Sequence, residues 1–274
     1  MAGDTKGSPS PPVVILARGL GTRMRKADPD TAVETDQAAV ADAGVKGMIP
    51  IDRPFLDYVL GALSDAGYEQ VCLVIGPEHD TIREHYTGVA PPARLVIEFA
   101  VQEKPLGTAD AVLAAEEFTR GEPFVVLNSD NYYPVEALAR LRSTKAPAII
   151  GFARKALIER GNVAPDRAGR FGALEIDDGG NLVSITPRKG SAAAPGEVYA
   201  SMNCWLFDSK IFDACRTVQM SPRGELELTR AVQMAIDAGM KIQVVKVDLP
   251  VLDLSSRADI PLVASRLRGI KVSY

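Results

Sequence analysis

The chain contains 274 residues and carries a formal net charge of −4, and 46% of its residues are hydrophobic. This length and composition are typical of one large α/β domain with a complete core. The acidic balance argues against a general nucleic-acid surface, and no apolar run reaches the about 18 residues that a transmembrane helix needs. The three cysteines show no Cys-x-x-Cys spacing and the two histidines no partner motif. This predicts buried free thiols in a reducing cytoplasm and no zinc site.

The first half of the chain shows a repeating strand–helix pattern. Residues 1–12 are polar and proline-rich, which predicts a disordered tail ahead of a single domain over residues 13–274. Beyond the tail, near-continuous apolar strands alternate with amphipathic helices, as in a mostly parallel sheet with helices on both faces. The expected strands are 13–17, 70–75, 94–99, 123–127 and 148–152, and the expected helices are 55–66, 77–86, 108–118 and 135–142.

The second half changes character. Residues 172–176 and 182–186 alternate apolar and polar positions around a turn at 177–181, which predicts a β-hairpin. The remaining expected elements are strands at 198–207 and 241–247 and helices at 225–238 and 257–268. We expect a small antiparallel annex over the carboxyl ends of the parallel strands, with a pocket between the two.

Residues 26–45 form an irregular insertion after the first strand. A short helix is expected over 35–42. The segment is long for a loop, so a lid over the neighbouring site and a passive surface insertion both remain open.

The first strand leads into a glycine-rich turn, Gly19-Leu20-Gly21-Thr22-Arg23. Glycines let backbone N–H groups approach an anion closely, and arginines at the far end of the turn add positive charge. The turn therefore predicts a nucleotide site. It lacks the Gly-Lys-Ser/Thr of a P-loop, and Met24 stands where a dinucleotide-binding fingerprint requires glycine or alanine.

Five segments occur in the order found in the sugar nucleotidyltransferase family, and together they resemble that family over nearly the whole chain after the tail. Residues 16–24 resemble Leu-Ala-Ala-Gly-x-Gly-Thr-Arg-Leu/Met, and 46–51 stand where the family has Pro-Lys-Pro-Leu-x-Pro-Ile. Residues 102–111 are similar to Gln…Gly-Thr-Ala-x-Ala, 128–131 to the Gly-Asp-Asn turn, and 223–229 to Arg-Gly-Glu-x-Glu-Leu/Ile-Thr. The resemblance implies a Rossmann-like nucleotide-diphospho-sugar transferase fold.

The resemblance also implies a reaction. A sugar 1-phosphate attacks the α-phosphorus of a nucleoside triphosphate (NTP) in line and pyrophosphate leaves, so the protein must offset repulsion between anions. Arg23 would hold the leaving phosphates and Lys46 would lie beside the α-phosphate. Asp130 and Asp253 would bind Mg²⁺, although Ser255 replaces the glycine that follows the second aspartate in the family. The nucleotide-binding residues implied are Ala17, Gly19, Leu20, Gly21, Thr22, Gln102, Gly107 and Thr108.

Gln102 and Gly107 are the candidates for recognising the base. A side-chain amide carries donors and an acceptor, which suits the O4/N3–H edge of uracil or thymine, and guanine also presents a mixed edge. This ranks UTP or dTTP ahead of GTP or CTP.

For the sugar phosphate, the resemblance points to a set on the second half of the chain. The set comprises Gly172, Asn203, Glu225 and Glu227, with Arg188 or Lys189 for the phosphate. The usual Glu-Lys-Pro after the hairpin is here Thr186-Pro187-Arg188-Lys189, so which base replaces the family lysine stays open.

Two other functions are considered. One is a cytidylyltransferase of the same fold acting on an amino-alcohol phosphate, but Asn203 and the Arg-Gly-Glu-x-Glu segment favour a polyhydroxylated acceptor. The other is a non-catalytic sensor that binds a nucleotide sugar. The sequence favours a cytoplasmic, Mg²⁺-dependent enzyme whose partners are an NTP and a sugar 1-phosphate, with no nucleic acid or membrane partner, and a homo-oligomer by analogy.

Overall fold

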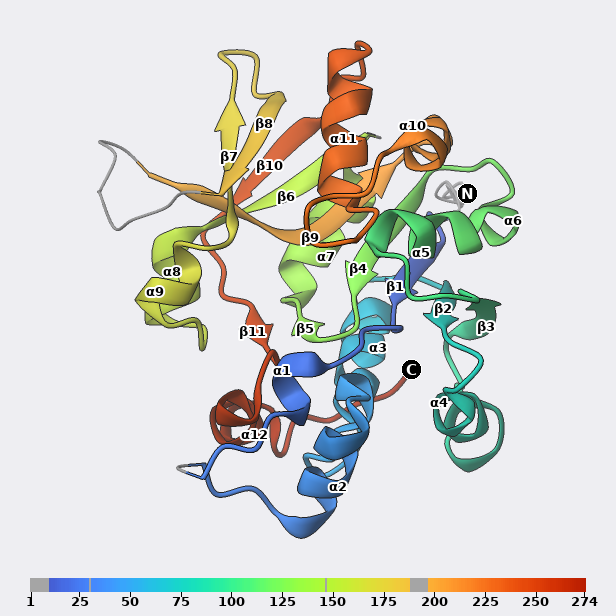
Figure 1. Cartoon of the computed structure of the whole chain (residues 1–274), viewed down its shortest axis with the longest axis vertical. Coiled ribbons are helices and arrows are strands. Elements are labelled where there is room, and N and C mark those ends of the chain that lie inside the picture. The colour runs from blue at the N-terminus through green and yellow to red at the C-terminus, as the bar shows by residue number, and fades with distance from the viewer. Residues whose placement is uncertain (1–9, 30, 146, 188–196) are drawn as a thin grey trace, which may run out of the picture.

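A computed structural model describes residues 10–29, 31–145, 147–187 and 197–274 (Figure 1). Most of the predicted tail, together with Arg188 and Lys189, lies outside these described residues. Val125 N donates to Pro12 O at 2.8 Å, so the chain is joined to the central sheet from Pro12 on.

The described residues form one large mixed sheet with the strand order β10-β6-β9-β4-β1-β2-β3. The strands are β1 (Val13–Leu16), β2 (Gln70–Ile75), β3 (Val96–Val101), β4 (Phe124–Asn128), β6 (Ala148–Ala153), β9 (Tyr199–Phe207) and β10 (Gln243–Val247). β1 runs parallel to both β2 and β4, β2 to β3, and β6 to β10. β9 is antiparallel to both of its neighbours, β4 and β6. The predicted fold class, a mostly parallel sheet with an antiparallel annex, is confirmed.

The hairpin of the annex consists of β7 (Gly172–Ile176) and β8 (Leu182–Pro187), and β7 joins the sheet where Ala173 pairs with Ala200 of β9. The hairpin lies at one end of the molecule (Figure 1). A separate two-stranded sheet pairs β5 (Asn131–Tyr132) with β11 (Leu252–Asp253). This small sheet joins residues about 120 positions apart, immediately beside Asp130.

Helices cover both faces of the large sheet, because alternate residues of each strand point to opposite faces. The helices are α1 (Thr22–Arg25), α2 (Thr35–Ala43), α3 (Phe55–Asp65), α4 (Asp80–Glu84), α5 (Thr108–Ala114), α6 (Glu116–Thr119), α7 (Val135–Ser143), α8 (Arg154–Glu159), α9 (Pro165–Ala168), α10 (Ile211–Thr217), α11 (Leu228–Asp237) and α12 (Ile260–Leu267). On β1, Val13 and Ile15 belong to one core with α3, α7 and α12, whereas Val14 belongs to a second core with α5, α10 and α11. Short 3₁₀ helices η1 (Lys46–Met48) and η3 (Arg257–Asp259) and a π-helical turn η2 (His85–Val89) complete the set. No helix in the described ranges is long and apolar enough to cross a membrane.

Several elements differ from the sequence-based expectation. The helix expected over 225–238 begins only at Leu228, and the helix expected over 108–118 breaks at Ala115 into α5 and α6. The helices α8, α9 and α10 were not predicted. They are seven residues or shorter, which is too short to show a clear helical period.

Candidate active site

The glycine-rich loop begins where β1 ends. Ala17 N still bonds to Val74 O of β2 at 2.9 Å, and the chain then turns into α1 through Gly21, whose φ is 60°. A Cβ at Gly21 would lie 2.3 Å from Gly44 O, so the loop and the end of α2 are in backbone contact. Arg25 strengthens this contact by donating from Nη2 to Ala43 O at 2.8 Å. The insertion that carries α2 therefore supports the loop from outside.

A cavity of about 350 Å³ opens at the carboxyl ends of β1 and β4. All of the predicted nucleotide-binding and catalytic residues line it. From those predictions, the lining contains Ala17, Gly19, Leu20, Gly21, Thr22, Arg23, Lys46, Gln102, Gly107, Thr108, Asp130 and Glu225. Gly172, Asn203, Glu227 and Asp253 do not belong to the lining, and Arg188 and Lys189 lie outside the described residues.

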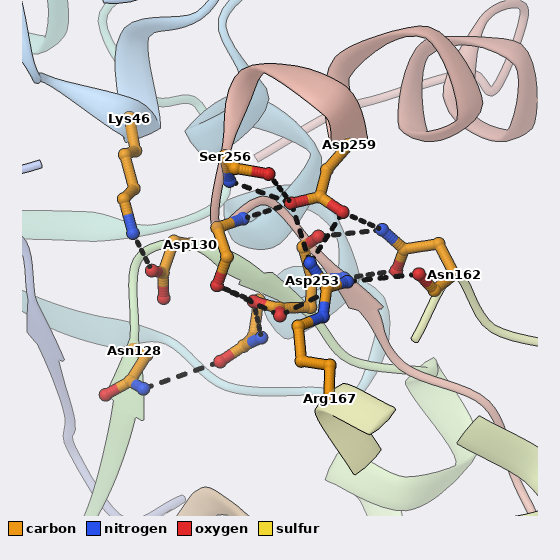
Figure 2. Close-up of polar contacts among 10 residues, drawn as sticks. Lys46, Asn128, Asp130, Asn162, Arg167, Asp253, Ser256 and Asp259 are labelled. Carbon is orange, nitrogen blue, oxygen red and sulfur yellow. Dashed lines mark hydrogen bonds and ion pairs between the residues drawn. The ribbon is translucent and has the colours of Figure 1, made fainter. Parts of the chain in front are cut away.

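Lys46 and Asp130, which both line this cavity, form an ion pair. The Lys46 ammonium lies 2.7 Å from Asp130 Oδ2, and the two side chains are only 14% and 22% exposed (Figure 2). η1 places Lys46 directly after the Gly44 turn. Asp130 is fixed in its own turn, because its carbonyl accepts a hydrogen bond from Leu254 N at 2.8 Å.

Asp253 lies beside Asp130 because β11 pairs with β5, which aligns Asp253 with Asn131. Its carboxylate is buried and accepts a hydrogen bond from Asn131 Nδ2 at 3.2 Å. Ser255 Oγ lies 3.0 Å from both carboxylate oxygens, so the residue that replaces the family glycine contacts this aspartate directly. Burial and the negative charge of Asp130 raise the pKa of Asp253 to about 6.

These two carboxylates fit a divalent cation. The negative charge of Asp130 disfavours the charged form of Asp253, and a bound cation would offset that penalty. Within the described ranges, no group of three or more His, Cys, Asp or Glu side chains is placed to hold a metal. Mg²⁺ usually binds through one or two carboxylates and takes its other ligands from phosphate oxygens and water.

Sequence reasoning missed the network behind Asp253. Arg167 of α9 bonds to Asp259 through Nη1 at 2.7 and 2.9 Å, and its Nη2 lies 3.6 Å from Asp253 Oδ2 (Figure 2). Asn162 bonds to the main chain of Asp253 on both sides, at 2.7 and 2.8 Å. No spacing in the sequence could have revealed this network, since its members lie about 90 residues apart and belong to short helices and turns.

At the other end of the cavity, the segments that hold Gln102 and Gly107 pack against the start of α11. Gly107 has a φ of 127°, and a Cβ there would lie 2.5 Å from Leu226 O. The Thr108 hydroxyl accepts a hydrogen bond from Leu228 N at 2.9 Å, so this residue caps α11 as well as lining the cavity. Main-chain bonds from Leu226 N to Leu106 O and from Ala109 N to Leu226 O complete the contact.

Arg18 is a second residue that sequence reasoning passed over. It stands where the family motif has alanine, and it lines the cavity. Its guanidinium pairs with Glu78 at 3.1 Å and also donates to Gln102 O. A Cβ at Gly76 would lie 2.4 Å from Arg18 Nε, so this glycine makes room for the ion pair.

The predicted sugar residues are more dispersed. Asn203 has a φ of 54° and lies at an irregularity where β9 changes register against β6. Tyr133 OH fixes this point by donating to Met202 O at 2.6 Å. A Cβ at Gly172 would lie 2.2 Å from Ile185 Cγ2, so close packing within the hairpin requires glycine there. Glu227 occupies the N-cap position of α11.

The fold is a Rossmann-like mixed sheet with a cavity at the carboxyl ends of its parallel strands. Residues 39–249 match the family model described as nucleotidyl transferase. The chain belongs to this family, which confirms the family and the class of enzyme expected from the sequence.

Two relatives illustrate the similarity in sequence. The chain is 28% identical over 259 residues to a UTP–glucose-1-phosphate uridylyltransferase of Haloferax volcanii, covering 93% of this chain and 96% of that protein. It is 34% identical over 236 residues to a glucose-1-phosphate thymidylyltransferase of Streptomyces antibioticus, covering 84% of this chain. It spans only 58% of the length of that thymidylyltransferase.

Solved structures show the same fold. A UDP-glucose pyrophosphorylase complexed with UDP-glucose superposes with a TM-score of 0.71 at 16% identity, covering 93% of this chain and 97% of the other. A UTP-bound enzyme of the same kind from Acinetobacter baumannii gives 0.70 at 20% identity, covering 95% and 94%. At these identities, the likeness concerns the fold.

Proposed function

We propose that this protein transfers a nucleoside monophosphate from UTP or dTTP to a sugar 1-phosphate and releases pyrophosphate. The observation that carries the proposal is the cavity in which the glycine-rich loop, Lys46, Asp130 and Gln102 meet. The uridylyltransferase and thymidylyltransferase relatives support the same two nucleotides and point to glucose 1-phosphate as the first acceptor to test.

The protein's own part in this reaction is to position anions and offset their charge. A sugar-phosphate oxygen forms a bond to the α-phosphorus while the bond from that phosphorus to the β-phosphate oxygen breaks. Arg23 and the loop backbone at 19–22 would hold the leaving pyrophosphate. Lys46 would reach the α-phosphate from its position in the cavity lining.

We propose Asp130 and Asp253 as the residues that hold Mg²⁺. When bound, the ion would supply positive charge to the phosphate oxygens. Lys46 neutralises Asp130 in the present structure. With a cation beside the two carboxylates, this lysine would be released for the α-phosphate.

On the sugar side, we propose that Glu225 contacts sugar hydroxyls, because it lines the cavity and Glu227 does not. Asn203 does not line the cavity and remains a proposed sugar contact on the family resemblance alone. Arg188 or Lys189 remains the proposed base for the sugar phosphate.

The decisive experiment incubates the purified chain with Mg²⁺, each common NTP and a panel of sugar 1-phosphates, and measures pyrophosphate release. Release with UTP or dTTP and one sugar phosphate is expected. Release only with CTP and an amino-alcohol phosphate would replace the proposal with the cytidylyltransferase. Binding of a nucleotide sugar without any release would replace it with the sensor.

We further propose that the enzyme is cytoplasmic, acts as one domain over residues 13–274 and assembles as a homo-oligomer. Its three cysteines support the location, since all are buried and free of disulfide bonds. Size-exclusion chromatography with light scattering tests the assembly.

A further inference from the structure

The side-chain amide of Gln102 is held in one orientation by two acceptors. Nε2 donates to Gly107 O at 3.0 Å and to Asp110 Oδ2 at 2.7 Å. An amide nitrogen has two hydrogens, and these two bonds use both of them. A flipped amide would place Oε1 against a carbonyl oxygen and a carboxylate, which would leave three acceptors facing one another without a hydrogen.

The backbone positions of both acceptors are fixed by the fold. Gly107 is held by the close approach of Leu226, and its carbonyl also accepts Ala111 N at 3.1 Å. Asp110 lies in the first turn of α5, directly across from Gln102.

The main chain of Gln102 is fixed as well. Its N–H donates to Ile75 O at 2.9 Å, and its carbonyl accepts a hydrogen bond from the Arg18 guanidinium. Because the main chain is held in this way, the two side-chain bonds decide the orientation of the Gln102 amide.

This arrangement leaves Oε1 as the available group. Within the described residues, no donor bonds to Oε1, and this oxygen is not among the fully buried side-chain atoms that lack a partner. Since Gln102 lines the cavity, Oε1 offers an acceptor to a molecule bound there.

An acceptor at this point distinguishes bases by their ring nitrogen. Uracil and thymine carry a hydrogen on N3 and can donate it to Oε1. Cytosine has a lone pair on N3, so the same position would bring two acceptors together. The flipped amide would suit cytosine, and the Asp110 carboxylate prevents that flip.

We propose that Asp110 is a positioning residue that locks the Gln102 amide with Oε1 toward the base and thereby selects uracil or thymine over cytosine. This inference rests on the proposed function, since it places the nucleotide in the same cavity. Asp110 itself acts through Gln102 and not on the reacting atoms.

The test is the Asp110→Asn variant. An asparagine can donate from its NH₂ group to a flipped Oε1, so the carboxylate no longer opposes the flip and only Gly107 O still does. The ratio of kcat/KM for UTP to that for CTP should fall at least about tenfold, the scale of one mispaired polar group. Glu117→Gln makes the same chemical change on the exposed surface of α6 and should leave the ratio unchanged.

An unchanged ratio of kcat/KM for UTP to that for CTP, including an equal loss of activity with both nucleotides, would overturn the lock. Calorimetric binding of UTP and CTP without any sugar phosphate gives the ratio independently of turnover. If the binding ratio shifts while no sugar supports pyrophosphate release, the lock stands and the proposed function fails. If pyrophosphate is released but Asp110→Asn changes neither the kcat/KM ratio nor the binding ratio of UTP to CTP, the proposed function stands and the lock fails.

A second measurement needs no variant. The wild-type chain should bind N3-methyluridine triphosphate at least about tenfold more weakly than UTP, because the methyl group replaces the hydrogen that Oε1 accepts. Equal binding of the two nucleotides would overturn the proposal even if Asp110→Asn failed to fold.

Discussion

The nucleotide side and the sugar side of the cavity are built differently. On the nucleotide side, short consecutive motifs supply the lining, and glycines are required where another backbone comes close, as at Gly21 against Gly44 and Gly107 against Leu226. On the sugar side, the candidates come from a hairpin, an irregular point of β9 and a turn before α11. Backbone groups that act locally leave a sequence motif, whereas a subsite assembled from separate elements leaves only scattered residues.

The largest expected effect is at Asp130, the proposed metal ligand in the cavity lining. Asp130→Asn removes one of the two carboxylates and should lower turnover at least about a hundredfold, the scale of losing a key electrostatic group. Pyrophosphate release under saturating substrates measures this. Near-normal turnover would remove Asp130 from the proposed metal site.

The next effect would show how strictly the nucleotide side depends on its glycines. Gly107→Ala places a Cβ against Leu226 O at a φ of 127°, and should lower the free energy of unfolding by about 2 kcal/mol. Gly88→Ala is the matched control, since a Cβ there meets nothing within 4 Å. Urea unfolding of both variants gives the difference, and equal stability would contradict the steric argument.

A smaller effect is expected at the arginine of the loop. Arg23→Ala should raise the KM for the NTP about tenfold, the scale of one charge-assisted hydrogen bond. The melting temperature should stay constant, because Arg23 is exposed and exposed charges contribute little to stability. A variant that unfolds would instead assign Arg23 a structural role.

The smallest effect sharpens the sugar side. Glu225→Gln should raise the KM for the sugar 1-phosphate about fivefold, since one hydrogen bond to a sugar hydroxyl is weakened. Glu227→Gln should change this KM far less, because Glu227 lies at the N-cap of α11 outside the cavity lining. The opposite ranking in steady-state kinetics would exchange the two roles.

The sequence alone determined the fold class and the family. The strand period, the glycine-rich turn and the order of the motifs are local properties that can be recognised in the sequence itself. They predict that Gly21, Lys46, Gln102 and Asp130 belong to one site. They could not show α8 to α10, whose helices are too short for a clear period.

The tertiary structure alone decided which side chains surround those motifs. Pairing of β5 with β11 brings Asp253 beside Asp130, and Arg167 and Asn162 then brace it from segments about 90 residues away. Likewise, Asp110 is recognisable as a partner of Gln102 only because α5 begins directly across from the end of β3. Such contacts follow from packing between distant elements, and packing has no signature in the local order of residues.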